Sequence, residues 1–343
     1  MTVSRRQILA GAAGLLLGSA VAAPAIARSR EKVAQAALDL LESIGIEGRE
    51  AVLHRFDDSD RRDWHYTPRS RPGLTLKDMS KSQRERVFAL LQTVLSDQGA
   101  HKVNEVIRLE GILGDITGNR FFRDPENYAI AIFGDPAGTA PWAWRFEGHH
   151  LSLSFTVVPG KGVAATPAFF GTNPAVVRPG HRHSGLRVLK QEHDIAFALV
   201  NGLTTAQRET AILQPSSFGD ILTGPGREDS LRAPQGLALG AMNAGQRDQV
   251  LRLIQSYVAN MRTDIAEREL RDLREAGIDR LHFAWAGGTT PDTAHYYRLH
   301  GPSVIIEYDN TQNGANHAHS VWHDPRDGFG ADLLRQHHER DHR

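Results

Sequence analysis

"GLTLKDMSKSQRERVFALLQTVLS" (residues 73–96) and "GLALGAMNAGQRDQVLRLIQSYVA" (residues 236–259) align with each other without a gap. In each stretch a serine or asparagine precedes apolar residues at helical spacing, such as Val87, Leu90 and Val94 in the first. This pattern predicts a capped amphipathic helix in both places. A shorter echo, "GLTTAQRETAIL", begins at residue 202. Repeats of this kind indicate a fold built from copies of one unit.

The segments that follow the two helices also match. They read "YAIAIFGDPAGTAPWAWRFEGHHLSLSFTV" (residues 128–157) and "LHFAWAGGTTPDTAHYYRLHGPSVIIEYDN" (residues 281–310). In each, an alternating strand leads into a turn rich in glycine, proline and threonine, and a second alternating strand follows, which predicts a β-hairpin. A lone hairpin buries too little apolar surface to be stable, so we expect the two hairpins to share one sheet or to pack face to face.

The predicted fold class is therefore α+β. An internally duplicated helix-plus-hairpin module forms a mainly antiparallel sheet core with helices packed on it. We expect a single domain over residues 28–343, with halves at about 73–158 and 236–310. Between the halves, residues 159–235 form a loop-rich insert around a helix near 189–201.

The first 27 residues have the pattern of a twin-arginine signal peptide. Arg5 and Arg6 precede an apolar run from Ile8 to Ala23, and "AIA" at 25–27 supplies a cleavage pattern. The run is short and rich in glycine, which argues against the alternative of an uncleaved membrane anchor. We expect export by the twin-arginine translocase, cleavage near Ala27, no membrane anchor afterwards, and a periplasmic or extracellular location.

Composition excludes several classes of function. The chain has 40 basic and 40 acidic residues, and it lacks the basic surplus that nucleic-acid binding requires. It contains no cysteine, so disulfides, thiolate metal sites and thiol catalysis are excluded. Neither a G-x-S-x-G elbow nor an H-E-x-x-H helix is present. "TGPGR" (223–227) is predicted to be a turn, and "GHRHSG" (180–185) an exposed loop.

Histidines mark the candidate site. Nine of the 17 lie between residues 282 and 342. His317 and His319, two apart in an extended segment, project from one side and can grip a metal ion. His149 and His150, on a repeat-related strand of the first hairpin, offer a third ligand, and we favour His150. We expect Asn313-Gly314 to supply the positive φ of a turn before His317, and the amides of this turn to fix the tautomers of the ligands. The alternative is that these histidines only hydrogen-bond an asparagine-rich loop.

Other polar residues near these histidines have candidate roles. Glu307 and Asp309 share one face of the preceding strand and are candidates for the general base. Arg145 and Arg298 stand at equivalent places in the repeat, where each would either clamp a substrate anion or pair with an acid of the sheet.

The chain resembles a family of secreted bacterial proteins, domain-of-unknown-function family 3500. The resemblance covers nearly all of residues 28–343 and rests on long motifs: "FEGHHLSLSFT", "FFGTNPA", "ILTGPGR", "HFAWAG", "HYYRLHGPSVIIEYDNTQNGANHAHSVW" and "FGADLLRQHH". The family name implies no activity. The resemblance implies a shared site at the positions of His149, His150, His295, Glu307, Asp309, Asn310, His317 and His319.

The same resemblance sorts the remaining candidates. His295 and Asn310 become candidates for substrate binding. His300 and His323 depart from the family pattern, so we do not expect them in the site. His337 matches the pattern and is either a further ligand or a solvated histidine on a charged helix.

Two functions fit these residues. The first is an exported metal-dependent hydrolase that acts on a small molecule with a divalent ion such as Zn, Fe, Mn or Cu. The same ligands would also serve a lyase or an oxygenase. The second is a periplasmic protein that binds a metal or small ligand without catalysis. An open coordination position beside a free carboxylate favours the enzyme.

Overall fold

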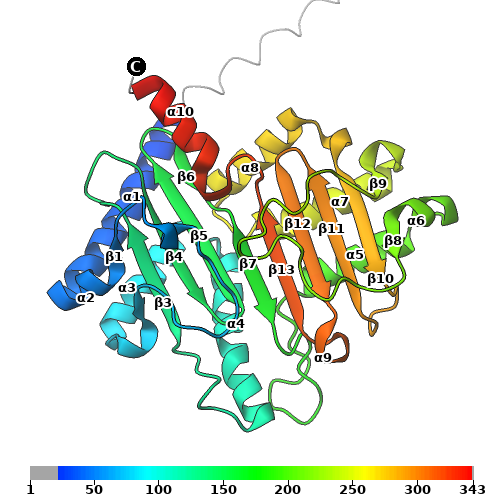
Figure 1. Cartoon of the computed structure of the whole chain (residues 1–343), viewed down its shortest axis with the longest axis horizontal. Coiled ribbons are helices and arrows are strands. Elements are labelled where there is room, and N and C mark those ends of the chain that lie inside the picture. The colour runs from blue at the N-terminus through cyan, green and yellow to red at the C-terminus, as the bar shows by residue number, and fades with distance from the viewer. Residues whose placement is uncertain (1–21, 342–343) are drawn as a thin grey trace, which may run out of the picture.

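The computed structural model describes residues 22–341, which form a large sheet with helices (Figure 1). The α-helices are α1 (Ala22–Ser43), α2 (Gly45–Val52), α3 (Lys81–Gln92), α4 (Asp97–Thr117), α5 (Lys190–Asn201), α6 (Thr205–Ala211), α7 (Ala244–Val258), α8 (Thr263–Ala276), α9 (Gln312–Ala315) and α10 (Ala331–Asp341). The strands are β1 (Leu53–His54), β2 (Leu74–Thr75), β3 (Tyr128–Phe133), β4 (Trp142–Gly148), β5 (Leu151–Val158), β6 (Gly162–Ala164), β7 (Ala168–Thr172), β8 (Ile212–Gln214), β9 (Leu237–Ala238), β10 (His282–Gly287), β11 (His295–Gly301), β12 (Val304–Asn310) and β13 (Ala318–His323). The predicted α+β class with a mainly antiparallel sheet is confirmed.

The described strands join one 13-stranded sheet, and the same arrangement of strands is met from either edge: a short parallel strand, three consecutive antiparallel strands and then a central strand. Ten strands follow the order β1-β3-β4-β5-β7-β13-β12-β11-β10-β8, and β2, β6 and β9 pair with β3, β5 and β10 beside this path. At each edge a short strand pairs in parallel with the first strand of a hairpin, β1 with β3 and β8 with β10. The centre is the antiparallel pair β7–β13, with Ala318 opposite Thr172. Both predicted hairpins, β3–β4 and β10–β11, are present and lie in this one sheet.

The sequence stretches that align at 73–96 and 236–259 have similar local structures. Each begins with a glycine at positive φ, +99° at Gly73 and +97° at Gly236, where a Cβ atom would lie 2.0 and 2.3 Å from a backbone oxygen of the neighbouring strand. Each then reaches a capping box, Ser80 with Gln83 and Asn243 with Gln246, at the start of α3 and α7. The predicted helices are therefore confirmed.

Some elements were not predicted. A second helix, α4 in the first segment and α8 in the second, lies between each predicted helix and its hairpin. The segment 159–235 contains the expected helix as α5, but it also supplies β7, a strand at the centre of the sheet. Strand β7 has only five residues, "AFFGT", which is too short for alternation to reveal it.

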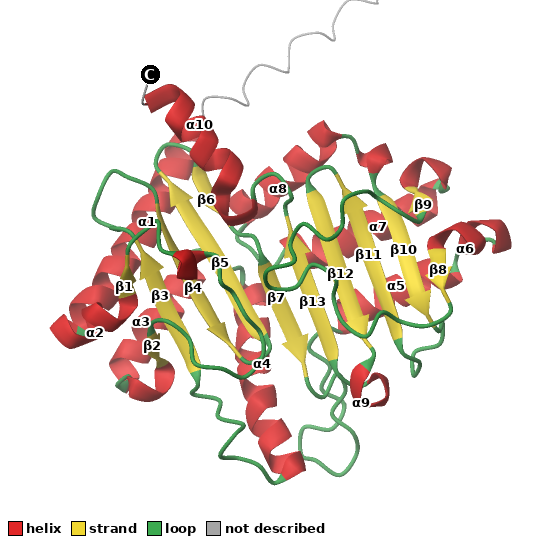
Figure 2. Cartoon of the chain, in the orientation of Figure 1, coloured by secondary structure: helices red, strands yellow, loops and turns green. Residues whose placement is uncertain are grey.

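Helices cover one face of the sheet, and loops cross the other (Figure 2). The helix face carries the main core, which includes Trp144, Phe155, Trp285, Tyr297 and Tyr308. On the loop face, the loops at 55–73 and 215–236 bury a second cluster, made of Trp64, Tyr66, Phe169, Ile221, Val321 and Phe329. Polar side chains on this face are therefore covered and held in place.

The predicted signal peptide lies largely outside the described residues. Arg5, Arg6 and the apolar run up to residue 21 belong to that part of the chain. Within residues 22–341, none of the helices has the length and apolar character needed to span a bilayer.

The turn before α10 predicts a pH-dependent stability. Asp327 accepts hydrogen bonds from the backbone N–H groups of Asp332 and Leu333, and burial raises the pKa of its carboxyl to about 7. An unfolded aspartate has a pKa of about 3.9, so between about pH 4 and pH 7 only the folded state holds this proton. The free energy of unfolding therefore falls as the pH rises through this window.

Asp327→Asn should remove this dependence because the amide oxygen still accepts both hydrogen bonds and does not ionise. We expect the variant to be more stable than the wild type by about 1–2 kcal/mol at pH 8 and nearly equal to it at pH 4. Urea unfolding at both pH values measures this. A constant difference between the two proteins across the range would contradict the assignment.

Candidate metal centre

His150 lies in the tight turn between β4 and β5, with a positive φ of 62°. The backbone fixes this turn: His150 N–H donates to the Tyr66 carbonyl at 2.9 Å, and Gly171 N–H donates to the His150 carbonyl at 2.7 Å. The imidazole lies over Gly171, where a Cβ atom would come within 2.8 Å of His150 Cδ2. The residue is 4% exposed, and these contacts hold its ring on the loop face of the sheet.

His317 and His319 come from the other half of the sheet. A left-handed turn brings the chain into β13: Asn313, Gly314 and Ala315 all have positive φ, which confirms the turn predicted at Asn313-Gly314. Asn310 closes the turn, since its side chain donates to the Ala315 carbonyl at 2.9 Å and accepts from His317 N–H at 2.9 Å.

The three imidazoles converge on one point. His317 Nε2 lies 2.8 Å from His150 Nε2 and 3.1 Å from His319 Nε2. In a tetrahedral site with metal–nitrogen bonds of 2.0–2.1 Å, neighbouring nitrogens are about 3.3 Å apart. Glu110, His149 and His150 form a second group of potential ligands. The predicted set of His150, His317 and His319 is thus brought together.

Burial keeps the rings of His150 and His317 neutral, which is the form that binds metals. It lowers the pKa of His317 to about 3 and that of His150 well below its usual value. His319 Nδ1 faces an Asp220 oxygen at 2.7 Å, which leaves a lone pair on His319 Nε2. His317 Nε2 can either donate or accept, so at most one of its two close contacts is a hydrogen bond. A cation at this point would satisfy all three nitrogens.

Asp220 and Tyr66 were not predicted. Asp220 orients His319 and accepts a hydrogen bond from the Tyr66 hydroxyl at 2.9 Å. Tyr66 in turn stacks on Phe169, and its ring edge meets His319 with centroids 4.8 Å apart. A carboxylate behind a ligating histidine fixes the tautomer and strengthens the ligand. The partner of His319 Nδ1 is thus Asp220 and not an amide of the asparagine-rich turn.

His149 supports His150 from behind. Its ring stacks on His150 with centroids 3.7 Å apart, and its Nδ1 lies 2.6 Å from Glu110 Oε2. Arg123 Nη1 is 3.0 Å from the same Nδ1. His149 is not a member of the three-histidine group, and its stacked ring positions the His150 ring there.

Glu307 accepts hydrogen bonds from the loop at 215–236 and from Tyr296 on β11. One carboxylate oxygen accepts the N–H and hydroxyl of Thr223, and the other accepts the N–H of Leu222 and the hydroxyl of Tyr296. The residue is fully buried. The "TGPGR" segment is thus a turn, as predicted, and the N–H groups of Thr223 at its start and of Leu222 just before it donate to this carboxylate. These contacts favour a loop-anchoring role for Glu307 over proton transfer.

Asp309 lies closer to the histidines. It is paired with His319 across β12 and β13, and it accepts hydrogen bonds from the hydroxyls of Ser217 and Thr311, each at 2.8 Å. Burial raises the pKa of its carboxyl. Of the two acids predicted as general bases, Asp309 is the one beside a ligand.

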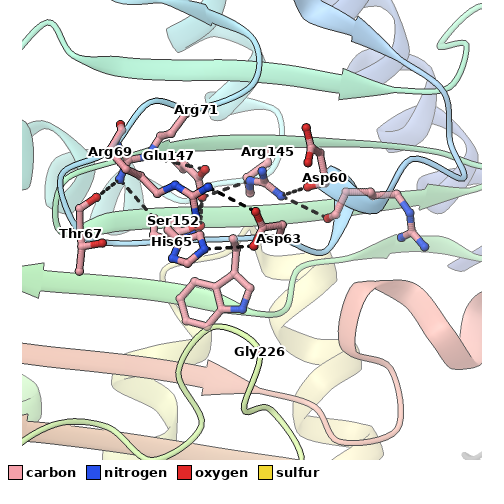
Figure 3. Close-up of polar contacts among 12 residues, drawn as sticks. Asp60, Asp63, His65, Thr67, Arg69, Arg71, Arg145, Glu147, Ser152 and Gly226 are labelled. Atoms are coloured by element: carbon pink, nitrogen blue, oxygen red, sulfur yellow. Dashed lines mark hydrogen bonds and ion pairs between the residues drawn. The ribbon is translucent and has the colours of Figure 1, made fainter.

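The predicted arginines hold the covering loops. Arg145 donates to the Asp60 carbonyl at 2.7 Å and pairs with Glu147 at 3.2 Å (Figure 3). Glu147 also accepts from the backbone N–H of His65 and the hydroxyl of Ser152. In the second half, Arg298 donates to the Gln235 side chain at 2.6 Å. Both are buried, so the structure gives Arg145 and Arg298 contacts within the protein in place of a substrate clamp.

Of the remaining candidates, His295 and His337 lie away from the histidine cluster, and Asn310 only supports the turn before it. His295 is buried on the helix face, stacked between Trp285 and Tyr308. Asn310 supports the turn before His317, as described above. His337 lies on α10, by the far end of β5 from His150 (Figure 1). Eight strand residues span about 26 Å, so His337 cannot reach the same ion.

Comparison with known proteins shows the family and no activity. No curated protein and no solved structure matches the chain. One family model, described as "Protein of unknown function (DUF3500)", matches residues 27–331, which include the three clustered histidines and both covering loops. The chain therefore belongs to the DUF3500 family of proteins of unknown function.

Proposed function

We propose that the chain is an exported metal-dependent hydrolase that acts on a small molecule, with a divalent ion held by His150, His317 and His319. The observation that carries this proposal is the convergence of three imidazole Nε2 atoms on one point. Three imidazoles without a fourth protein ligand are the donor set of catalytic rather than structural metal sites. Imidazole ligands suit Zn, Cu and Fe, and Mn completes our candidates.

The residues around the ligands have separate tasks in this proposal. Asp220 holds the tautomer of His319, and His149 fixes the His150 ring. An ion bound here would supply Lewis-acid chemistry at the open position. Asp309, next to His319, is the residue we assign to accepting a proton, while Glu307 holds the loop that carries Asp220.

Elemental analysis of the purified protein, followed by hydrolysis assays, tests the proposal. We expect about one divalent ion per chain, and cleavage of simple ester, amide or phosphoester substrates that chelation abolishes and the same ion restores. Asp309→Asn should retain the ion and lose the activity. Absence of any ion after aerobic and anaerobic preparation would contradict the metal site itself.

A second candidate is a periplasmic protein that binds a metal or small ligand without catalysis. It is favoured by the saturated hydrogen bonding of Glu307 and Asp309, neither of which is left free beside the ligands. One ion per chain with no hydrolysis of any substrate class would select this candidate.

Asp220→Asn should weaken metal binding without disrupting the fold. The amide still accepts from Tyr66 but no longer offers a carboxylate to His319 Nδ1, and loss of such a partner lowers metal affinity by roughly 10–100-fold. Competition with a chromophoric chelator measures the affinity. Asp229→Asn, an exposed change in the same loop, is the control. Equal affinities in the wild type and Asp220→Asn would remove Asp220 from the site.

Export by the twin-arginine translocase is part of the proposal. It is supported by the pattern around Arg5 and Arg6 and by a family match that starts at residue 27. Changing both arginines to lysine should leave the precursor in the cytoplasm, because a receptor reads this signal. Immunoblots of fractionated cells measure this, and normal processing of the variant would mean that another export route suffices.

We also propose that the halves at about 73–158 and 236–310 are copies of one unit. The symmetrical strand order, the two parallel edge pairs and the matching capping boxes support this. The candidate metal site lies where the halves meet: His150 comes from the first, and His317 and His319 come from the strand that follows the second. Neither half holds a site alone.

A further inference from the structure

A cavity of about 740 Å³ opens on the helix face of the sheet, on the other side of the turn that carries His317. Its walls come from α5, the segment after β7, the turn at 310–316 and the β10–β11 connection. The volume falls in the range of about 300–1,000 Å³ that is typical of small-molecule sites. None of the three clustered histidines lines it.

The floor of this cavity holds hydroxyl groups without partners. Thr172 is fully buried, and its Oγ1 makes no hydrogen bond in the described part of the chain. Tyr308 is 1% exposed and stacks on Tyr297 and His295, and among residues 22–341 its hydroxyl has no hydrogen-bond partner either. Buried polar atoms are almost always satisfied, so the unpaired Thr172 Oγ1 points to an absent acceptor, and the Tyr308 hydroxyl in the same cavity is free to donate as well.

The walls add charged groups and an apolar surface. Asp292 is exposed in the lining, and among the described residues it has no ion pair. Arg187 is neutralised by Asp194, with Nη2 and Oδ1 2.5 Å apart. Arg178 is exposed, and in the described residues it has no ion pair. Phe197 and Leu189 give the apolar wall. The cavity therefore offers hydroxyl donors at its floor, a guanidinium at its rim and an apolar wall between them.

We propose that this cavity is a second ligand site, separate from the histidine cluster, which binds a small organic monocarboxylate with an apolar body. The carboxylate meets Arg178, the body packs on Phe197, and an acceptor atom meets the hydroxyls of Tyr308 and Thr172. A guanidinium provides the fork of donors that suits a carboxylate.

Calorimetric titration with 4-acetylbenzoate, whose ketone oxygen is the acceptor atom, and with 4-acetylbenzamide as its neutral counterpart, tests the proposal; these two probes are called benzoate and benzamide from here on. We expect EDTA-treated protein to bind benzoate, and to bind benzamide at least about 10-fold more weakly, because a charge-assisted hydrogen bond is worth about 1.5–3 kcal/mol. Binding of benzoate only after metal loading would place the carboxylate at the histidine cluster and overturn the proposal. Absence of benzoate binding in both forms would overturn it as well.

Two variants locate the ligand. Arg178→Gln, an exposed change, should weaken benzoate binding by about 10-fold and leave benzamide unaffected. Tyr308→Phe keeps the stacked ring, removes only the hydroxyl, and should weaken both probes by about 3–10-fold. Arg182→Gln, exposed in the same connection but outside the cavity lining, is the control. Unchanged affinity in both Arg178→Gln and Tyr308→Phe would exclude this cavity.

Discussion

A chain that carries both His317→Ala and His319→Ala should bind no metal ion under conditions in which the wild type holds one. The two changes remove two of three converging nitrogens and leave a single imidazole. Structural zinc sites with four ligands are worth about 10–16 kcal/mol, or roughly 3 kcal/mol per ligand, so losing two should weaken binding by about 10⁴-fold. Metal content per chain after gel filtration measures the loss.

His323→Gln is the matched control for this experiment. His323 lies on the same strand and the same face as His319, but its Nε2 contacts the Thr223 carbonyl at 2.9 Å instead of the cluster. Its replacement should leave the metal content unchanged and lower the stability slightly. Equal metal in the wild type and the double variant would refute the site, and loss of metal from the control alone would relocate it.

Glu307→Gln should produce the largest loss of stability among single changes on the loop face. Its carboxylate is fully buried and accepts four hydrogen bonds, two of them from the backbone of the 215–236 loop. The amide replaces one accepting oxygen by an NH₂ group. Two of the four buried N–H and O–H donors would then face this NH₂ group and lose their acceptor. We expect the free energy of unfolding to fall by about 2–4 kcal/mol.

Limited trypsin digestion should report the same change locally. Arg227 and Arg232 lie in this loop and are exposed, so cleavage there should accelerate once the anchor is weakened. Asp229→Asn changes a carboxylate in the loop that is exposed to solvent, and it should digest like the wild type. Wild-type stability and digestion in Glu307→Gln would mean that the loop is held by its apolar residues, such as Ile221.

The sequence predicted those parts of the site that depend on local geometry. The spacing of His317 and His319 placed them on one side of a strand, and Asn313-Gly314 marked the turn before them. Hairpins and capped helices followed from alternation and from the serine or asparagine before each helix. These features require information from only a few neighbouring residues.

The contacts that complete the site could not be predicted in this way. Asp220 meets His319 across 99 residues, and Tyr66 meets Asp220 across 154. Both lie in irregular loops whose paths over the sheet no periodicity reveals. The same limit applies to Glu307: its position on the polar face was clear, but the loop that covers it was not. His295 was grouped with the site on the family resemblance alone, which does not say that its side chain lies on the helix face of the sheet.

The central pairing of β7 with β13 has a consequence for folding kinetics. His150 and His317 are 167 residues apart, and β7 lies between their strands in the sheet. Each hairpin forms by closing a short loop, whereas the histidine cluster forms only when one very long loop closes. The large entropy cost of this closure delays it until late in folding. We therefore expect metal capture to follow the rate-limiting barrier, so that added metal slows unfolding and leaves the refolding rate unchanged.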